Sequence, residues 1–425
     1  MLDIKLFRDN PEKVLESEKK RFRSTENVEK VIEYDNLWRD GLQTLNNLRS
    51  EKNKLSKSFK QAKKDGNIQE VVEKSKQVAN DIKELQPKIA EYEQIRDEYR
   101  YKVGNIIDEK VPVSDTEDDN KIIRTYGTKK EFDFTPLNHV DIMELIDGAD
   151  TQTAAQVSGS RFYYLKEDIL FLNLALIQFA LNELTIQGYT PLQTPFFIKS
   201  QVAKETSELG EFEETLYKVE NEDLFLIATA EQTLAALHRD EIIDSEELPK
   251  RYCALSTCFR KEAGSHGKDT LGIFRVHQFE KIEQFIYSAP EESSNEHEKL
   301  LEVTEQIYQK LGLSYQIVAI VSSALNDNAA IKYDLEAWFP GSGAYRELVS
   351  CTNCTDYQAR KTKTRVGKAG ASDSQILHTL NSTAIATERT ICCIIENYQQ
   401  ENGDVLIPEV LQPYMNGKTV IKAKK

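Results

Sequence analysis

Residues 253–286 read CALSTCFRKEAGSHGKDTLGIFRVHQFEKIEQFI, and this stretch decides how the second half of the chain is expected to fold. Two segments with strand-like content, Tyr252–Arg260 and Gly272–Ile286, flank a middle that is rich in glycine and charge. They predict an antiparallel hairpin with a long loop. Alternation along the second strand predicts one face with Phe274, Val276, Gln278 and Glu280, and another with Arg275, His277, Phe279 and Lys281.

This hairpin carries cations, carboxylates and an aromatic ring on what should be a rigid sheet. Such a sheet can hold a polyphosphate nucleotide with fixed geometry. The alternative is a charged surface hairpin without a ligand. However, Arg260, Glu262, Arg275 and Glu283 recur within a largely apolar frame, which a solvated face rarely needs. The pattern therefore favours a binding site.

The bulk composition is that of a globular protein with more than one domain. The chain has 425 residues, of which 40% are apolar and 29% charged, enough for two or three domains. A net charge of −15 argues against wholesale coating of nucleic acid but allows a local basic patch. No apolar run approaches the roughly 20 residues of a membrane helix. Because the start, MLDIKLFRDN, lacks a secretory segment, we expect a cytoplasmic protein without membrane association.

The six cysteines are expected to be free thiols, since a large protein without a secretory segment rarely forms disulfides. Cys351 and Cys354 form one CxxC, which is half of a zinc pattern. Neither a second CxxC nor a spaced histidine pair completes it. Zinc binding is thus the less favoured alternative.

The first hundred residues predict a helical hairpin. Asp9-Asn10-Pro11 marks a helix start, and apolar residues then repeat with 4-3 spacing in two stretches, the second from Val71 to Val103. Lys63–Asn67 supplies a turn between them. We therefore expect an antiparallel coiled coil with arms of roughly 35 residues, about 50 Å long. Pro87 should kink the second arm, because proline removes a helical hydrogen bond.

One end of this hairpin is strongly basic. Between residues 49 and 64, seven cations and one acid (Glu51) give a local net charge of 7 − 1 = +6. An ordinary solvated helix face would also account for a charge run. The reversal of sign in an acidic chain instead favours RNA phosphates as the partner. The cations are Arg49, Lys52, Lys54, Lys57, Lys60, Lys63 and Lys64.

We place a domain boundary near Gly104. Residues 104–127 are acidic and broken by Pro112, so we expect a helical domain at 1–103, a linker at 104–127 and a second domain at 128–425. Within the second domain, Ile169–Gln187 is apolar nearly all round. Such a helix should be buried by the core and by a second subunit, or by the core alone. Gly188 should end it.

Several of these segments resemble the seryl-tRNA synthetases, a family of class II aminoacyl-tRNA synthetases. FRKEAGS and GIFRVHQFEKIE, within residues 259–283, are similar to motif 2. GYTPLQTP (188–195) resembles motif 1, HTLNSTAIATERTICCIIENYQ (378–399) resembles motif 3, and TAE (229–231) resembles the element that contacts the amino acid. The resemblance implies an α+β fold, with an antiparallel coiled-coil hairpin followed by an antiparallel sheet flanked by helices.

The same resemblance implies the reaction and its partners. The enzyme would activate L-serine with ATP and Mg²⁺ to seryl-adenylate, then transfer serine to the 3′ end of tRNA(Ser), with the selenocysteine tRNA as a further candidate. The hairpin would lie across the tRNA. The segment Ile169–Pro195 would form a homodimer.

The resemblance also assigns site residues. Arg260, Arg275 and Arg389 would be catalytic, with Arg260 bridging the serine carboxylate and the α-phosphate, since a planar guanidinium can hold two oxygens. Serine would be bound by Thr229, Glu231, Arg260, Glu283 and Thr383. ATP would be bound by Arg260, Glu262, Arg275, Val276, Phe279, Glu347, Ser350 and Arg389. Mg²⁺ would be held by Glu347 and Ser350, which are three residues apart on a strand and need a bulge to face one ligand.

Some positions depart from the family pattern or allow another interpretation. Many bacterial members carry serine at the position of Thr383. Eukaryotic and some archaeal members carry threonine there, as this chain does. Glu388 precedes Arg389 where a neutral residue is usual, and its charge could weaken phosphate binding. Thr229 could equally be a helix N-cap, with Glu231 in the first turn. His266 and His277 could be general bases, although the activation chemistry needs none.

Two other functions remain as alternatives. One is a synthetase-like ligase that loads a carrier protein, although such homologues lack the hairpin. The other is a non-enzymatic RNA-binding coiled coil, which would leave the arginines of the second domain without a purpose.

Overall fold

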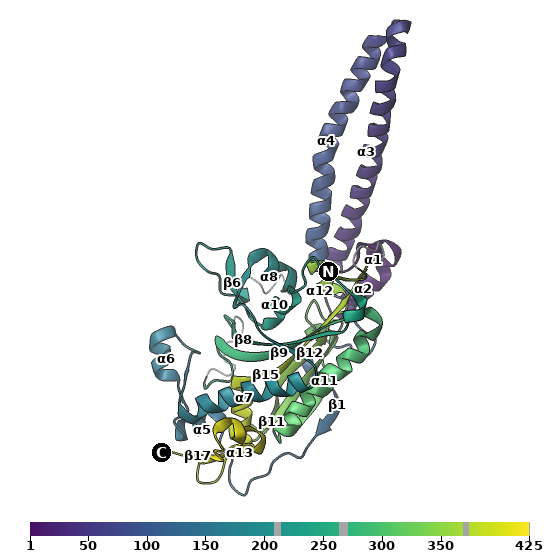
Figure 1. Ribbon diagram of the computed structural model, residues 1–425. Coiled ribbons are helices and arrows are strands. Elements are labelled where there is room, and N and C mark those ends of the chain that lie inside the picture. Colours follow the sequence, from purple (N-terminus) through teal and green to yellow (C-terminus); the bar gives the residue numbers. More distant parts are fainter. Residues whose placement is uncertain (208–213, 263–270, 369–373, 425) are drawn as a thin grey trace. The chain divides into compact units, whose positions relative to one another are not determined.

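The structure is a computed structural model that describes residues 1–207, 214–262, 271–368 and 374–424 (Figure 1). These residues divide into two compact units, Met1–Gly104 and Asn105–Lys425.

The first unit is built from helices. They are α1 (Ile4–Asp9), α2 (Pro11–Lys20), α3 (Glu26–Asp65) and α4 (Ile68–Tyr101). The Asn10 side chain caps α2 by accepting from the Lys13 backbone N–H, and Pro11 is the first helical residue, as predicted. Gly66 ends α3 with φ of +79°, a conformation that costs glycine little. Helix α3 continues to Asp65, so the turn is shorter than the predicted Lys63–Asn67 and consists of Gly66 and Asn67.

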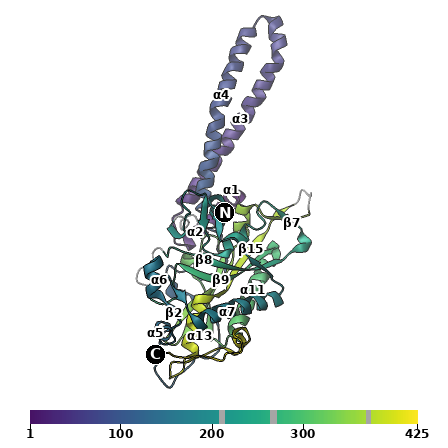
Figure 2. The same ribbon diagram turned by 60° about the vertical axis from the view of Figure 1, so that its left-hand side comes forward.

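Helices α3 and α4 run side by side, and the predicted helical hairpin is confirmed (Figures 1 and 2). Leu45 and Ala62 on α3 and Val78 and Ile89 on α4 are buried between them. Gly41 allows an especially close approach, because a Cβ at this position would lie 2.9 Å from Ile89 Cγ1. Helix α4 runs without interruption through Pro87.

The second unit is organised around a mixed, mostly antiparallel sheet. Among the described residues this sheet has eight strands, and only the outer pair β4–β8 is parallel. In spatial order they are β1 (Lys121–Tyr126), β10 (Tyr315–Ala319), β11 (Ile331–Phe339), β12 (Ala344–Asn353), β15 (His378–Ala386), β9 (Gln278–Ser288), β8 (Lys250–Phe259) and β4 (Thr190–Gln193).

The predicted hairpin is present as β8 and β9, which pair antiparallel from Lys250↔Tyr287 to Phe259↔Gln278. One part of the prediction was wrong. The second strand begins at Gln278 and not at Gly272, because residues 272–277 leave the ladder. The predicted alternation therefore holds only from Gln278 onward.

Helices cover both faces of this sheet and extend around it. They are α5 (His139–Leu145), α6 (Thr151–Ser158), α7 (Glu167–Ile186), α8 (Ser200–Thr206), α10 (Ala230–Ala235), α11 (Ser293–Lys310), α12 (Tyr357–Thr362) and α13 (Thr387–Tyr398). Helices α7, α11 and α13 pack along the sheet (Figure 2). Gln284 on β9 points to this side, since its amide donates to Thr304 of α11.

Short strands form further small sheets: β2 (Ala149–Asp150) with β3 (Tyr164–Leu165), β5 (Phe197–Lys199) with β6 (Leu224–Leu226), β7 (Ile242–Ile243) with β13 (Arg365–Val366) and β14 (Gln375–Ile376), and β16 (Val405–Leu406) with β17 (Val420–Ile421).

Helix α7 corresponds to the apolar segment Ile169–Gln187, and Gly188 follows it with φ of +84°. Within the described residues it is the one helix long and apolar enough to cross a membrane by length and composition. The prediction that no apolar run approaches this length was therefore wrong. A buried core helix passes the same test, and Leu172, Leu176 and Phe179 of α7 are fully buried.

The segment 104–127, expected to be a linker, contributes to the second unit. Its residues Lys121–Tyr126 form the edge strand β1, which pairs with β10. Ile107 and Val111 are buried in the main core of this unit. The acidic composition concealed these contacts, because only a few apolar residues anchor the segment.

Candidate active site

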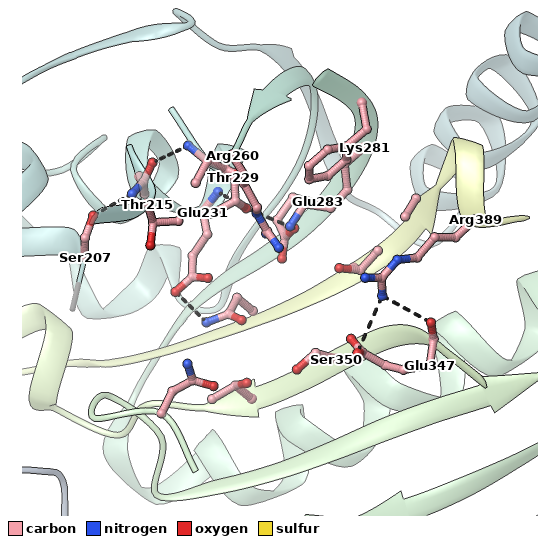
Figure 3. Close-up of a pocket in the computed structure, with 18 of the residues that line it drawn as sticks. Ser207, Thr215, Thr229, Glu231, Arg260, Lys281, Glu283, Glu347, Ser350 and Arg389 are labelled. Atoms are coloured by element: carbon pink, nitrogen blue, oxygen red, sulfur yellow. Dashed lines mark hydrogen bonds and ion pairs between the residues drawn. The ribbon is translucent and has the colours of Figure 1, made fainter. Parts of the chain in front are cut away.

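A cavity of about 350 Å³ opens in the second unit. Its walls come from β9, β11, β12 and β15, from the residues that follow β8, from the N-terminus of α13 and from the start of α10. Every residue predicted to bind serine, ATP or metal lies on its lining: Thr229, Glu231, Arg260, Glu262, Arg275, Val276, Phe279, Glu283, Glu347, Ser350, Thr383 and Arg389. Figure 3 shows Thr229, Glu231, Arg260, Glu283, Glu347, Ser350 and Arg389 around the cavity.

The three arginines reach this cavity from distant parts of the chain. Arg260 follows β8, and its Nε donates to Ala228 O at 3.2 Å while its guanidinium lies 5.1 Å from the Phe279 ring centroid. Arg275 precedes β9, and its Nη1 donates to Glu262 Oε2 at 2.9 Å. The third arginine, Arg389, lies on α13, which begins directly after strand β15. The fold thus concentrates three permanent positive charges on one cavity.

Arg389 is the third residue of α13, which begins at Thr387. Its guanidinium points toward Glu347 in Figure 3. The Nη1 atom lies 3.5 Å from Glu347 Oε2 and donates to Glu347 O at 3.2 Å. The same guanidinium lies 5.0 Å from the centroid of the Phe274 ring. These contacts hold Arg389 at the cavity wall.

A β-bulge brings Glu347 and Ser350 to the same side of β12. Leu335 pairs with Val349 but the next residue, Glu336, pairs with Glu347, so Leu348 is the extra residue. The predicted need for a bulge is thereby met. Burial raises the pKa of Glu347, but Arg389, Lys332 and Arg260 outweigh burial and hold the pKa below its ordinary value. Glu347 is therefore ionised at neutral pH.

At the other end of the cavity, Thr229 and Glu231 lie near Glu283 (Figure 3). Thr229 caps α10, because its Oγ1 accepts from the Glu231 backbone N–H at 3.2 Å, and the same hydroxyl donates to Glu283 Oε2 at 3.4 Å. The N-cap interpretation and the position at the cavity are both correct. Lys281 Nζ lies 2.5 Å from Glu283 Oε2.

The carboxylate of Glu231 is held by side-chain amides. Its Oε1 accepts from Asn328 at 3.3 Å, from Gln358 at 2.7 Å and from Asn381 at 3.1 Å. Sequence reasoning missed these amides, which come from separate segments and form no local pattern. Lys281 was also missed as a site residue, although it lies between Phe279 and Glu283 on the same face of β9.

The histidines and cysteines have structural surroundings. His277 Nδ1 lies 2.8 Å from Arg260 O, and its ring packs near Phe162 and Tyr217. His266 lies outside the described residues. All six cysteines are buried free thiols. Within the described ranges, no group of three or more histidine, cysteine or acidic side chains could hold a metal.

Glu388 does not pair with Arg389. The residue is 2% exposed, and its carboxylate accepts from the Tyr163 hydroxyl and from the Glu280 backbone N–H. Burial raises the pKa of Glu388 to about 7. The expected conflict between the two neighbouring charges is therefore reduced, because the carboxylate turns away from the guanidinium.

Both units are similar to known proteins. Residues 1–107 match the family described as Seryl-tRNA synthetase N-terminal domain, and residues 215–398 match tRNA synthetase class II core domain (G, H, P, S and T). A serine–tRNA ligase from Methanosphaera stadtmanae is 84% identical over 424 residues, covering 100% of both chains. A cytoplasmic serine–tRNA ligase from Arabidopsis thaliana is 49% identical and covers 100% of this chain and 97% of its own.

A solved structure agrees with these matches. The crystal structure of seryl-tRNA synthetase from Pyrococcus horikoshii complexed with ATP superposes with a TM-score of 0.97 at 43% identity, covering 100% of both chains. The sequence similarity spans the helical hairpin as well as the sheet, so this chain belongs to the seryl-tRNA synthetase family, the class II enzymes that ligate serine to tRNA.

Proposed function

We propose that this protein activates L-serine with ATP to form seryl-adenylate and then transfers the seryl group to the 3′ end of tRNA(Ser). The observation that carries the proposal is the convergence of Arg260, Arg275 and Arg389 on one cavity that also contains Glu231 and Glu283. Three cations suit a triphosphate, and two carboxylates suit a small polar ammonium compound. The relative from Pyrococcus horikoshii was solved with ATP, which supports ATP as the nucleotide.

Activation is an in-line displacement in which a serine carboxylate oxygen attacks the α-phosphorus and pyrophosphate leaves. No protein nucleophile is needed, so the residues act by positioning and by neutralising charge. Arg260 would bridge the serine carboxylate and the α-phosphate. Arg275 and Arg389 would bind the β- and γ-phosphates in exchange for their present partners, Glu262 and Glu347. Glu262 would then accept from the adenine amino group, with Phe279 stacked on the base beside Val276.

The residues near β12 fit Mg²⁺. Glu347 and Ser350 supply oxygen ligands, which a hard divalent cation prefers, and ATP phosphates would complete its coordination. Asp334 pairs with Ser350 in the ladder, and its buried Oδ1 has no hydrogen-bond partner among the described residues. This region therefore offers a further acceptor oxygen. The ion would neutralise charge on the phosphates.

Serine would occupy the end of the cavity near Glu231. Glu283 would accept from the serine hydroxyl, Thr229 and Glu231 would bind its ammonium group, and Thr383 would close the pocket. A buried carboxylate left without its hydroxyl partner would penalise alanine. Threonine would be rejected by size, which discriminates less strongly for one methyl group.

The two units would divide the labour. Residues 1–103 would bind tRNA(Ser) through the basic stretch from Arg49 to Lys64, and residues 128–425 would carry out the chemistry. We limit the proposal to tRNA(Ser), since the cavity contacts concern serine and ATP and not the choice of tRNA.

A second copy of the chain would cover α7. Relatives from Arabidopsis thaliana and Dictyostelium discoideum are named cytoplasmic, and we propose the same compartment here.

ATP–pyrophosphate exchange tests this proposal directly. The protein should catalyse exchange with serine, and much less with threonine, alanine or cysteine run in parallel. Arg260→Ala should lower the serine-dependent rate at least about 100-fold, as removal of one preorganised donor does. Arg365→Ala, at an exposed arginine outside the cavity, is the matched control and should retain the rate. Absence of serine-dependent exchange in the unmodified protein would refute the proposal.

A further inference from the structure

Glu388 is a buried carboxylate at the junction between two walls of the cavity. It is the second residue of α13 and is 2% exposed. Its Oε1 accepts from Tyr163 Oη, and its two oxygens each lie 3.1 Å from the backbone N of Glu280. The Thr387 hydroxyl donates to Oε2 at 3.0 Å. These donors use most of the acceptor capacity of the carboxylate.

These bonds join the segments that carry proposed ATP ligands. Glu280 lies between Phe279 and Lys281 on β9, and both of these side chains line the cavity. Glu388 is followed directly by Arg389. The carboxylate therefore ties the backbone of β9 to the first turn of α13, and Thr387 Oγ1, which also contacts Glu280 O at 3.2 Å, is a second tie between the same two segments.

Burying the Glu388 carboxylate costs free energy, so we expect the arrangement to have a role. A carboxylate buried among neutral donors pays a desolvation penalty, and among the described residues no ion pair links Glu388 to a lysine or arginine. The Glu280 side chain is held separately, by Asn173 Nδ2 of α7 at 2.5 Å from Oε2. An uncharged residue would satisfy the helix start at less cost. The alternative role of a carboxylate in the first turn is to interact favourably with the positive end of the helix dipole.

We propose that Glu388 is a positioning residue for ATP, because its carboxylate fixes the spacing between Phe279 on β9 and Arg389 on α13. The inference rests on the proposed function in taking these two side chains as contacts of the adenine and of the phosphates. Glu388 itself would not touch the reacting atoms. Tyr163 assists by filling one lone pair of the carboxylate and keeping it turned toward β9.

The test compares Glu388→Gln with the unmodified protein. Glutamine has nearly the same shape, but its NH₂ group would face donors in place of one acceptor oxygen. We expect the KM for ATP to rise about 10-fold, the scale for a lost hydrogen bond to a charged group, with the KM for serine unchanged. Tyr163→Phe should shift the KM for ATP in the same direction but by less. Equilibrium ATP affinity, measured by isothermal titration calorimetry, should weaken in parallel.

Glu396→Gln is the matched control. Glu396 lies on the same helix and is 1% exposed, but its carboxylate accepts from His139 N and Gly341 N away from the cavity. It should lower thermal stability without changing the ratio of the two KM values. Unchanged ATP affinity in Glu388→Gln, or equal changes in both KM values, would overturn the inference. A protein that binds ATP without serine-dependent exchange would refute the proposed function alone, since ATP affinity would still test Glu388.

Discussion

At the scale of single residues, His297 makes the stability of the second unit depend on pH. It lies on α11, is 3% exposed, and stacks on Tyr333 with ring centroids 5.2 Å apart. Its Nε2 lies 3.3 Å from Cys351 O. Burial lowers the pKa of His297 to about 4. The folded protein therefore holds this ring neutral under conditions in which the unfolded chain would protonate it.

The sign of the effect follows from linkage. Above the unfolded pKa of about 6.5 neither state binds the proton, so His297 costs nothing there. As the pH falls from about 6.5 toward 4, the unfolded state gains a proton that the folded state refuses, and stability decreases. The variant His297→Gln cannot titrate. We expect the advantage of the unmodified protein over this variant to shrink by about 2 kcal/mol between about pH 7 and pH 5.

Urea unfolding at both pH values checks this prediction. A Trp38→Phe background leaves Trp338 as the fluorescent reporter, which lies in the second unit. Other titrating groups are common to both proteins and cancel in the comparison. A difference in unfolding free energy that stays constant with pH would contradict the prediction.

The residue scale also shows what local sequence could and could not predict. Thr229 and Glu231 were predicted because they follow a strand within a short motif. The amides that orient Glu231 were not, since Asn328, Gln358 and Asn381 are assembled only by the tertiary fold. The direction of Glu388 was equally inaccessible, because it depends on Tyr163, which lies 225 positions away.

At the scale of elements, strand and helix types followed from periodicity but their ends did not. Residues 272–277 continue the alternating pattern of β9, yet they leave the sheet to bring Phe274, Arg275 and Val276 to the cavity. The bulge at Leu348 was expected from the function and not from composition. The close approach of Gly41 to Ile89 could not be predicted from periodicity, because it depends on how the two helices pack.

Helix α7 presents an apolar stripe that its own unit leaves uncovered. Leu170, Phe171 and Leu174 are 42%, 52% and 51% exposed. Leu174 lies four residues after Leu170 and three after Phe171, so the three side chains share one side of the helix. Exposed apolar stripes of this kind mark interaction sites. We expect a homodimer that buries this stripe, and Phe171→Asp should convert it to monomers, because a buried charge without a partner is costly.

Sedimentation velocity distinguishes the two states. Leu237→Asp is the control, since Leu237 is 43% exposed but lies outside α7. It should leave the dimer intact. If both the unmodified protein and Phe171→Asp sediment as dimers of equal stability, the stripe does not form the interface.

At the scale of the whole molecule, charge substitutions can test whether the first unit binds tRNA while the second unit activates serine. All seven cations from Arg49 to Lys64 are exposed on α3, so their charge is available to a phosphate backbone. Substitution of Lys57, Lys60 and Lys64 by glutamate should lower kcat/KM for tRNA(Ser) at least about 10-fold. It should also make the dependence of log affinity on log salt shallower by about 2 to 3, since each lost phosphate contact removes nearly one unit. Serine-dependent exchange should not change, because the substituted residues belong to the other unit.

The control must change the net charge equally without touching the basic stretch. Lys5, Lys13 and Lys19 are exposed lysines of the same unit, and their substitution by glutamate gives a protein of identical net charge. If long-range attraction by the whole chain governed tRNA binding, the two triple variants would lose affinity alike. If local contacts govern it, only the variant of the basic stretch should lose charging while both retain exchange. Because the chain carries a net charge of −15, its overall field repels RNA, and we therefore expect the local result.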